Sequence, residues 1–203
     1  MKKSLFVLVA AILLMSFQSK AQIGVHLGYN LAKMSGSNVP AGVNEKYLSN
    51  LAGGVFYEKG LVPLLSIRLG LMYSPKGAHF ENGADYSKWI INYIEIPVLA
   101  KVKLGPLYGL GGVYGAYALN SKVKTKTLGV EASSDFDFDA NKIKRLDYGM
   151  KFGLGLQFGL GPIHIFAQGD YSFGLNNLND NSTGNDIKNK VIGASVGVLL
   201  GFK

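Results

Sequence analysis

The chain has 203 residues, of which 27 are glycine, 11 are tyrosine, 11 are phenylalanine and none is cysteine. The lack of cysteine excludes a disulfide framework, thiolate chemistry and the acylated cysteine of a lipoprotein. The formal net charge of +8 is scattered along the chain. Since no basic face with aromatic residues forms a recognisable nucleic-acid-binding module, we expect no nucleic acid as a partner.

The N-terminal segment has the form of a secretory signal peptide. Two lysines near the start precede an apolar run over Leu5–Phe17, and the small residues Ser19 and Ala21 stand at the −3 and −1 positions of a cleavage site. The apolar run of about 13 residues is shorter than the roughly 20 that a spanning helix needs, and no later segment offers about 18 uninterrupted apolar residues. We therefore expect a signal peptide over residues 1–21 and one mature domain over residues 22–203.

The mature chain alternates apolar residues with small or polar ones in eight stretches. In the last stretch, Ile192, Ala194 and Val196 alternate with Gly193 and Ser195. Such alternation gives a strand one face for lipid and one face for a barrel interior. The predicted strands, in chain order, are 23–33, 51–59, 64–74, 91–104, 107–119, 146–158, 163–173 and 190–202.

The connections between these strands are alternately short and long. The short ones carry the glycine and proline of tight turns and cover residues 60–63, 105–106 and 160–162. The long ones are polar and cover residues 34–50, 75–90, 120–145 and 174–189. An even strand number then places every short turn in the periplasm and every long loop outside the cell. These features predict an all-β fold, an eight-stranded antiparallel transmembrane β-barrel that is closed by pairing of its last strand with its first.

Charged residues fall on the predicted interior face. Eight strands leave an interior just wide enough for side chains, and unpaired charges there are strongly penalised, so we expect ion pairs that form a plug. We expect the plug to contain Arg68, Glu95 and Lys101, with Arg68 close to an inward residue of the next strand and the register left open. A narrow gated conduit is the alternative. So polar an interior argues against a soluble calycin-like barrel, which carries its apolar face inside. Glu58 is a further candidate, but three consecutive bulky residues, Val55 to Tyr57, leave open which side chains of its strand face inward. The predicted interior charges are Arg68, Glu95, Lys101, Lys103, Asp147, Lys151 and Asp170.

Glycine recurs at every second position in parts of two predicted strands. Glycine is poor in ordinary strand interiors, but a small closed barrel has a crowded interior with room for few large side chains. We therefore expect these glycines to face inward. They are Gly109, Gly111 and Gly115 in one strand and Gly149, Gly153, Gly155 and Gly159 in the other.

The sequence gives little support for catalysis or for a bound metal. A serine, histidine and carboxylate set has to be gathered to act, and the one set that is close along the chain falls in or beside a predicted loop, where we interpret it as solvated. The candidate metal set is spread over different strands. We therefore predict no catalytic, cofactor-binding or metal site. The residues considered are Ser74, His79 and Glu81 or Asp85 for catalysis, and His26, His164 and Asp170 for a metal.

Segments of the mature chain resemble those of a known family. Tyr93–Lys101 reads Tyr-Ile-Glu-Ile-Pro-Val-Leu-Ala-Lys, and Tyr171–Asn177 reads Tyr-Ser-Phe-Gly-Leu-Asn-Asn. Together with the glycine-rich opening strand Ile23–Asn30, they are similar to PorT-like outer-membrane β-barrel proteins over essentially the whole mature chain. The resemblance implies an outer-membrane barrel of mostly undefined role, in a family with one branch linked to protein secretion and gliding. No residue places this chain in that branch.

We expect a non-enzymatic protein of a Gram-negative outer membrane, with no cofactor. Its barrel, surrounded by lipid, would carry loops that bind an extracellular or envelope protein, since loops on a rigid scaffold carry recognition. The alternative is a small channel or an accessory component of transport or protein secretion across the outer membrane. Phe202, near the end of the last strand, is the expected insertion signal for the barrel-assembly machinery. Lys122, Lys124 and Lys126, beside a loop, would contact anionic lipid head groups or lie in solvent.

Overall fold

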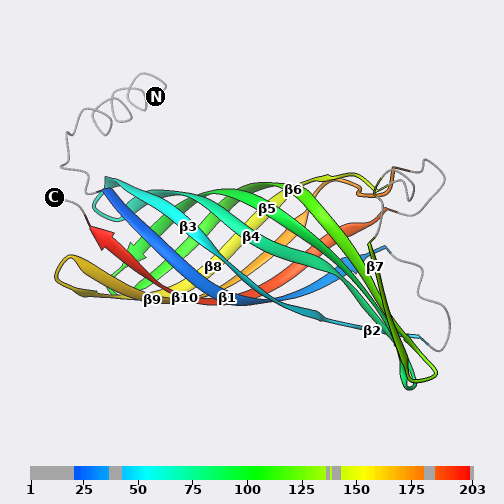
Figure 1. Ribbon diagram of the computed structural model, residues 1–203. Helices are drawn as coiled ribbons and strands as arrows, with labels where there is room; N and C mark the ends of the chain where they lie inside the picture. Colours follow the sequence, from blue (N-terminus) through cyan, green and yellow to red (C-terminus); the bar gives the residue numbers. More distant parts are fainter. Residues whose placement is uncertain (1–20, 37–42, 136–137, 139–142, 181–185, 202–203) are drawn as a thin grey trace.

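The computed structural model describes residues 21–36, 43–135, 138, 143–180 and 186–201. The described residues form ten strands of one sheet, all paired antiparallel. The strands are β1 (Ala21–Ser35), β2 (Asn44–Lys46), β3 (Leu48–Val62), β4 (Leu65–Asn82), β5 (Asp85–Leu104), β6 (Leu107–Thr127), β7 (Val130–Asp135), β8 (Leu146–Leu160), β9 (Ile163–Gly174) and β10 (Lys188–Gly201). Eight of them close a ring in the order β1, β3, β4, β5, β6, β8, β9, β10 and back to β1 (Figure 1). Within this part of the chain there is no helix long and apolar enough to cross a membrane.

The eight ring strands match the eight predicted strands, and the predicted barrel is therefore confirmed. Short turns join β3 to β4, β5 to β6 and β8 to β9 at the end of the ring where β1 begins and β10 ends (Figure 1). Gly105 and Gly161 have φ angles of 62° and 66°. A positive φ at the first central residue is what a II′ hairpin turn requires, and glycine adopts it without steric cost.

The ring closes along the seam between the first and last strands. β1 and β10 are in register from Gln22 opposite Gly201 to Ser35 opposite Lys188. Because each ring strand has a neighbour on both sides, its backbone N–H and C=O groups have partners, which a lipid surrounding demands. Phe202 lies outside the described residues, and so does the predicted signal peptide apart from Ala21, the first residue of β1.

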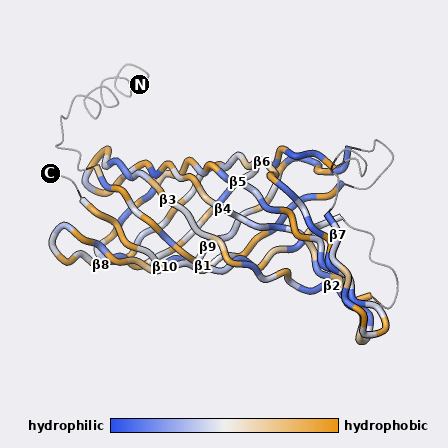
Figure 2. The backbone as a smooth tube through the Cα atoms, viewed as in Figure 1, coloured by the Kyte–Doolittle hydropathy of each residue, from blue (hydrophilic) through white to orange (hydrophobic). Residues whose placement is uncertain are grey.

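Hydrophobic and hydrophilic residues alternate along the strands of the ring (Figure 2). The hydrophobic ones make the outer face of the ring apolar. Each ring strand contributes exposed apolar side chains, among them Leu27, Leu51, Leu71, Val98, Val113, Leu154, Ile165 and Val196. Tyrosines face outward toward the loop-side ends of the strands. These residues, which we call the tyrosine girdle, are Tyr29, Tyr73, Tyr117, Tyr148 and Tyr171. Tyrosine rings favour the level of the lipid head groups, so the girdle marks the outer boundary of the membrane-spanning band.

Three of the predicted loops, residues 34–50, 75–90 and 120–145, are wrong in part, because strands continue through them or form within them. β4 and β5 run on to a turn at residues 83–84, and β6 runs on to Thr127. β2 pairs with the end of β4 and β7 with the end of β6, so five strands form a ribbon that projects beyond the ring (Figure 1). We call this ribbon, made of residues 44–46, 76–82, 85–90, 120–127 and 130–135, the arm. Most of its charged residues, which suggested loops, lie on one face of the sheet, as in antiparallel sheets with one solvated side.

The prediction that the alternating glycines face inward holds on β8 and is wrong on β6. On β8, a Cβ added to Gly155 would lie 2.3 Å from Cζ of Tyr108, so glycine makes room for that ring inside the barrel. On β6, Tyr108 itself is an inward residue, and Gly109, Gly111 and Gly115 alternate with it on the outer face. A Cβ added to Gly115 would meet no atom within 4 Å. Tyr108, Leu110 and Tyr114 of β6 therefore fill the lumen, and the three alternating glycines face lipid.

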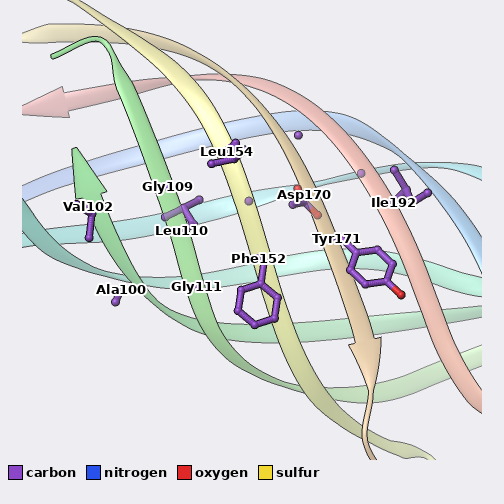
Figure 3. A pocket seen from close by; sticks show the side chains of 13 residues that line it. Ala100, Val102, Gly109, Leu110, Gly111, Phe152, Leu154, Asp170, Tyr171 and Ile192 are labelled. Carbon is purple, nitrogen blue, oxygen red and sulfur yellow. The ribbon is translucent and has the colours of Figure 1, made fainter. Parts of the chain in front are cut away.

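The outward glycines shape the surface of the barrel. Gly109 and Gly111, together with Gly169 of β9, form the floor of an open groove on the outer face, flanked by Phe152, Leu154 and Tyr171 (Figure 3). The groove faces the same way as the exposed apolar residues of the ring. It belongs to the lipid-facing surface and not to the interior.

Candidate functional site in the barrel lumen

Most of the charges that alternation assigned to the interior lie in the lumen. On β3, Val55 and Tyr57 face outward while Phe56 and Glu58 face inward, which settles the parity of that strand. Lys103 and Asp170 are half-buried. The six predicted residues with side chains buried in the lumen are Glu58, Arg68, Glu95, Lys101, Asp147 and Lys151.

Nearer the short turns, Glu58, Arg68 and Lys101 form what we call the turn-side cluster. Arg68 Nη2 and Nε donate to Oε2 of Glu58 at 2.8 and 3.0 Å, and Lys101 Nζ donates to Oε1 of Glu58 at 2.7 Å. Lys101 Nζ also donates to Gln157, and Arg68 Nη1 donates to Oε1 of Gln168 at 3.0 Å. One buried carboxylate is thus shared by two cations whose other N–H groups find amide oxygens, as buried charges require.

Aromatic rings surround the guanidinium of Arg68. Its Cζ lies 4.1 Å from the ring centroid of Phe56, 5.5 Å from that of Phe166 and 5.7 Å from that of Tyr108. The Tyr108 hydroxyl donates to Oε1 of Gln168 at 3.2 Å. Cation–π contacts of this kind stabilise a desolvated arginine, so the rings and the carboxylate together hold Arg68 in place across the lumen.

Farther toward the loops, Lys76, Glu95, Asp147 and Lys151 form the loop-side cluster. Lys76 Nζ lies 2.9 Å from Oε2 of Glu95 and 3.0 Å from Oδ2 of Asp147, and all three side chains are 0% exposed. Lys151 Nζ donates to Oε1 of Glu95 at 2.6 Å. Asn189 Nδ2 donates to Oδ2 of Asp147 at 2.9 Å. Two lysines and two carboxylates therefore alternate in one connected network.

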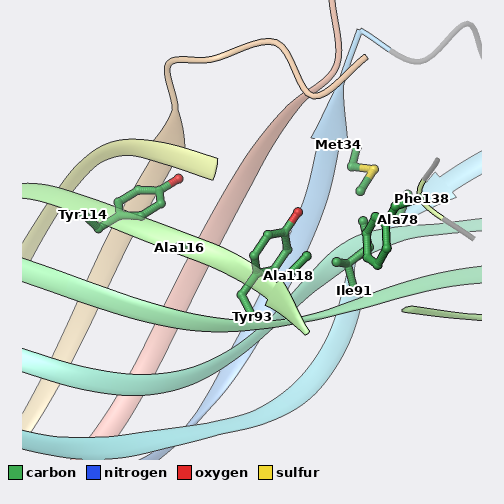
Figure 4. Close-up of a cluster of buried hydrophobic side chains, with 8 residues drawn as sticks. All are labelled: Met34, Ala78, Ile91, Tyr93, Tyr114, Ala116, Ala118 and Phe138. Carbon is green, nitrogen blue, oxygen red and sulfur yellow. The ribbon is translucent and has the colours of Figure 1, made fainter. Parts of the chain in front are cut away.

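An apolar cluster covers the loop-side cluster toward the mouth of the barrel (Figure 4). The rings of Tyr114 and Tyr93 have their centroids 4.0 and 5.3 Å from Lys76 Nζ. The members of the apolar cluster are Met34, Ala78, Ile91, Tyr93, Tyr114, Ala116, Ala118 and Phe138. The paired charges are thus separated from the water at the mouth by side chains that offer few polar groups.

Arg68, Glu95 and Lys101 all lie in the lumen, but Glu95 belongs to the loop-side cluster and the other two to the turn-side cluster. Arg68 lies opposite Leu99 of β5 and opposite Glu58 of β3, so its carboxylate partner comes from the strand before it and not from the strand after it. Sequence reasoning also misses Lys76, since residues 75–90 were predicted as a loop. The alternation along the strand could have predicted it, because Lys76 is an even number of residues after Arg68 and therefore faces the same side.

The described interior charges nearly balance. The five cations are Arg68, Lys76, Lys101, Lys151 and the half-buried Lys103, and the four anions are Glu58, Glu95, Asp147 and the half-buried Asp170. A closed ring of eight strands leaves little more space than its inward side chains need. Paired and hydrogen-bonded charges in that space connect β3, β4, β5 and β8 across the lumen.

The residues considered for catalysis are not gathered. Ser74 lies in the lumen, where its Oγ accepts a hydrogen bond from Nδ2 of Asn30 at 3.1 Å. His79 lies on the arm with Nε2 3.2 Å from Oε1 of Glu81, five residues or about 16 Å along the strand from Ser74. The carboxylate of Asp85 accepts a backbone N–H at 3.0 Å. Ser74 is therefore out of reach of the histidine and of both acids.

The residues considered for a metal are also apart. The ring of His26 packs edge-on against Phe56 with centroids 5.8 Å apart, and His164 Nδ1 lies 3.5 Å from Nε2 of Gln22. Six residues of β9, about 20 Å of extended chain, separate His164 from Asp170. Among the residues that the structure describes, no three His, Cys, Asp or Glu side chains are grouped as metal ligands.

Comparison with known proteins agrees with this architecture. The family model described as outer membrane protein beta-barrel domain matches residues 16–180. No sequence among the curated proteins matches this chain.

Several solved structures are similar to the chain at low sequence identity. Ail, the attachment invasion locus protein of Yersinia pestis, is 17% identical with a TM-score of 0.43, over 89% of this chain and 99% of Ail. OprG of Pseudomonas aeruginosa is 9% identical with a TM-score of 0.46, over 91% and 97%. The outer membrane protease OmpT of Escherichia coli is 9% identical with a TM-score of 0.47, over 93% and 99%. On the match over residues 16–180, the chain belongs to the outer membrane protein beta-barrel domain family.

Proposed function

We propose that this outer-membrane barrel does not conduct ions and that it acts, without catalysis, as a surface-binding protein through its arm and loops. The lumen carries the first part of the proposal. The inside of the ring, which side chains just fill, holds nine nearly balanced charges, the amides of Gln157, Gln168 and Asn189, and several aromatic rings. Opening a path through it would leave buried charges without partners, which is strongly unfavourable.

The segment Tyr93–Lys101, which resembles PorT-like barrels, serves both clusters. Glu95 joins the loop-side cluster and Lys101 the turn-side cluster. The inward charges of this strand are therefore used to close the lumen, and its apolar residues Ile96 and Val98 face outward. The resemblance supports a place for the chain among PorT-like barrels, in a non-enzymatic role in the envelope.

The arm supports the second part of the proposal. Lys46 lies opposite His79, His79 opposite Lys88 and Lys88 opposite Lys124, so one row of the arm carries basic residues across four strands. Like charges directly opposite one another weaken a sheet. Among the residues that the structure describes, β2 and β7 also pair on one side only, and an unpaired edge is a site for strand addition. A projecting sheet with a basic face and two open edges is suited to binding an extracellular or envelope protein.

Conductance in planar bilayers tests the closed lumen. We expect the mature wild-type protein to give no steady current. The double variant Glu58→Ala/Glu95→Ala removes one carboxylate from each cluster and should give brief openings, while Lys124→Ala on the arm should behave as wild type. A large steady conductance of the wild type would overturn the closed lumen and favour a channel.

Shortening the arm tests the binding role. Ala78 and Trp89 are direct partners across β4 and β5, so replacing residues 79–88 with Asn-Gly should leave a shorter hairpin with a favoured two-residue turn. Whole cells carrying either protein would be treated with a membrane-impermeant crosslinker and the barrel purified. We expect a protein partner with the wild type and none with the short-arm variant, both showing heat-modifiable migration on gels. Equal recovery of the partner from both would contradict a role for the arm.

A further inference from the structure

We infer that the protein has a binding site for a small apolar molecule at the base of the arm. A cavity of about 200 Å³ lies there, on the side of the arm opposite its basic row. Ala78 and Phe80 of β4 and Trp89 of β5 form its arm wall, and Met34 of β1 also lines it. Ala78 and Met34 belong to the apolar cluster at the mouth of the barrel (Figure 4), so the cavity continues that cluster outward.

The remaining wall comes from the segments before β8 and before β10, which hydrogen bonds tie together. Ile143, Leu178 and Ile187 line the cavity on this side. The backbone N–H of Leu178 donates to the carbonyl of Ile187 at 2.8 Å, and that of Lys144 donates to the carbonyl of Leu178 at 2.8 Å. Asn177 Oδ1 accepts the N–H of Ile187 at 2.9 Å. These bonds hold the wall without any contribution from a ligand, so the cavity is formed in advance, as most ligand sites are.

The lining decides the chemical class of the ligand. Every lining side chain is aliphatic, aromatic or a thioether, and the indole Nε1 of Trp89 already donates to Oγ of Ser87 at 3.1 Å. A polar ligand would lose its hydrogen bonds to water and find no replacement. An apolar cavity of roughly 150 Å³ stays dry and accepts benzene. A cavity of about 200 Å³ therefore suits a slightly larger hydrocarbon, such as a substituted benzene or a short alkyl chain.

The position of the cavity decides the source of the ligand. Met34 follows Tyr29 of the tyrosine girdle by five residues, and Ala78 follows Tyr73 by five residues, about 16 Å along each strand. The cavity thus lies on the water side of the girdle, beyond the membrane-spanning band. Its ligand is a free molecule that arrives from outside the cell, and not the acyl chain of a membrane lipid.

The fluorescence of Trp89 reports on this site directly, because it is the only tryptophan in the sequence. The purified mature barrel in detergent would be titrated with bromobenzene, an apolar molecule whose heavy atom quenches indole fluorescence. We expect quenching that saturates. Ala78→Leu fills part of the cavity and should weaken the saturable phase at least tenfold, and Met34→Phe provides a second filled variant if Ala78→Leu does not assemble.

Bromobenzene also dissolves in detergent, so a matched reporter is needed. The variant Trp89→Phe/Leu154→Trp moves the only tryptophan to the lipid-facing surface, where Leu154 is 75% exposed, and its quenching should rise without saturation. Non-saturating quenching of the wild type, or saturable quenching that both filled variants retain, would overturn the site.

Vesicles whose phospholipids carry brominated acyl chains distinguish a free molecule from a membrane lipid. In these vesicles the acyl chains should quench the fluorescence of the Trp89→Phe/Leu154→Trp variant, because its indole lies on the lipid-facing surface. The same chains should leave the fluorescence of Trp89 in the wild type unchanged. Strong quenching of Trp89 by the brominated chains would overturn the assignment to a free molecule.

Discussion

Lys76 contacts two buried carboxylates at once, and its removal tests the loop-side cluster at the scale of one residue. Lys76→Met keeps most of the side-chain volume but leaves Glu95 and Asp147 short of a cation. Breaking a buried ion pair from one side typically costs about 3–5 kcal/mol, and we expect a loss of that size in the free energy of unfolding, measured by urea titration in one detergent. Lys124→Met on the exposed arm should stay within about 0.5 kcal/mol. Equal stability of the two variants would contradict the cluster.

The separation of the two clusters can be measured by double-mutant cycles. Glu95 and Lys151 are in contact at 2.6 Å, so Glu95→Gln and Lys151→Met should show an interaction energy of about 0.5–3 kcal/mol. Glu95 and Lys101 are six residues apart on β5, about 20 Å. Glu95→Gln and Lys101→Met should therefore add within roughly 0.5 kcal/mol. A large interaction energy between Glu95 and Lys101 would contradict the separation of the two clusters.

Two glycines provide a matched pair for the inner and outer faces. Gly155→Ala would bring a methyl group to 2.3 Å from the Tyr108 ring and 2.7 Å from the carbonyl oxygen of Ala167, an overpacking that typically costs about 1–3 kcal/mol. Gly115→Ala places its methyl group in open space on the outer face. We expect it to be neutral or to stabilise the strand by about 0.5–1 kcal/mol. If urea unfolding shows that Gly115→Ala destabilises the barrel more than Gly155→Ala, then the inward and outward faces of β6 or β8 are assigned wrongly.

At the scale of elements, alternation is enough to predict the ring strands, because lipid and lumen make opposite demands on successive residues of a strand. It fails for the arm for a physical reason. Pro75 lacks a backbone N–H and argues for the end of a strand, yet β4 continues through it opposite Asn92, where the pairing of β5 with β6 also shifts register. Beyond this point the two faces of the strands no longer meet lipid on one side and the lumen on the other. The alternation of apolar and polar residues therefore changes although the strand does not end.

The same limit applies to the candidate site. Parity along each strand predicts which charges point inward, as it does for Arg68 and Glu95. Which charges meet depends on the register between strands, and the closed ring sets that register through pairings far apart in the sequence. Lys101 of β5 meets Glu58 of β3 across 43 residues of sequence. No local pattern contains that information.

The arm should respond to pH through His79. Burial and the nearby Lys88 lower the pKa of His79 and together outweigh the carboxylate of Glu81, which acts in the other direction. The folded arm therefore binds this proton less tightly than an unfolded arm does. Its local stability is full above the ordinary histidine pKa of about 6.5 and falls as the pH drops below that value.

Hydrogen exchange can test this pH dependence. Between pH 7.5 and 5.5, arm amides should open more readily at the lower pH after correction for intrinsic exchange, and amides of β8, which contains no histidine, should not. The pKa of Glu81 is lowered, chiefly by its hydrogen bond to Lys46, so that carboxyl titrates below this window. His79→Gln should abolish the difference between the two pH values. An unchanged pH response in His79→Gln would rule out His79 as its origin.

At the scale of the whole molecule, closure of the ring makes lumen, lipid face and arm depend on one another. If β1 and β10 separated, their backbone groups would face hydrocarbon without partners, at several kcal/mol for each group. The same opening would expose both charge clusters, which are built from residues of β3, β4, β5 and β8. We therefore expect the ring and its charged interior to unfold as one cooperative unit, with the arm able to open separately.

The last prediction concerns the seam, and it uses the absence of cysteine from the chain. Leu27 and Val196 are direct partners across β1 and β10, and opposed residues of antiparallel strands have Cα atoms about 4.5–5.5 Å apart, within the reach of a disulfide. Mild oxidation of Leu27→Cys/Val196→Cys should give an internal crosslink, seen as faster migration of the boiled sample that reducing agent reverses. Leu27→Cys/Leu154→Cys should not crosslink, because β9 and β10 lie between β1 and β8. Crosslinking of the second pair as efficiently as the first would show that β1 and β10 do not close the barrel.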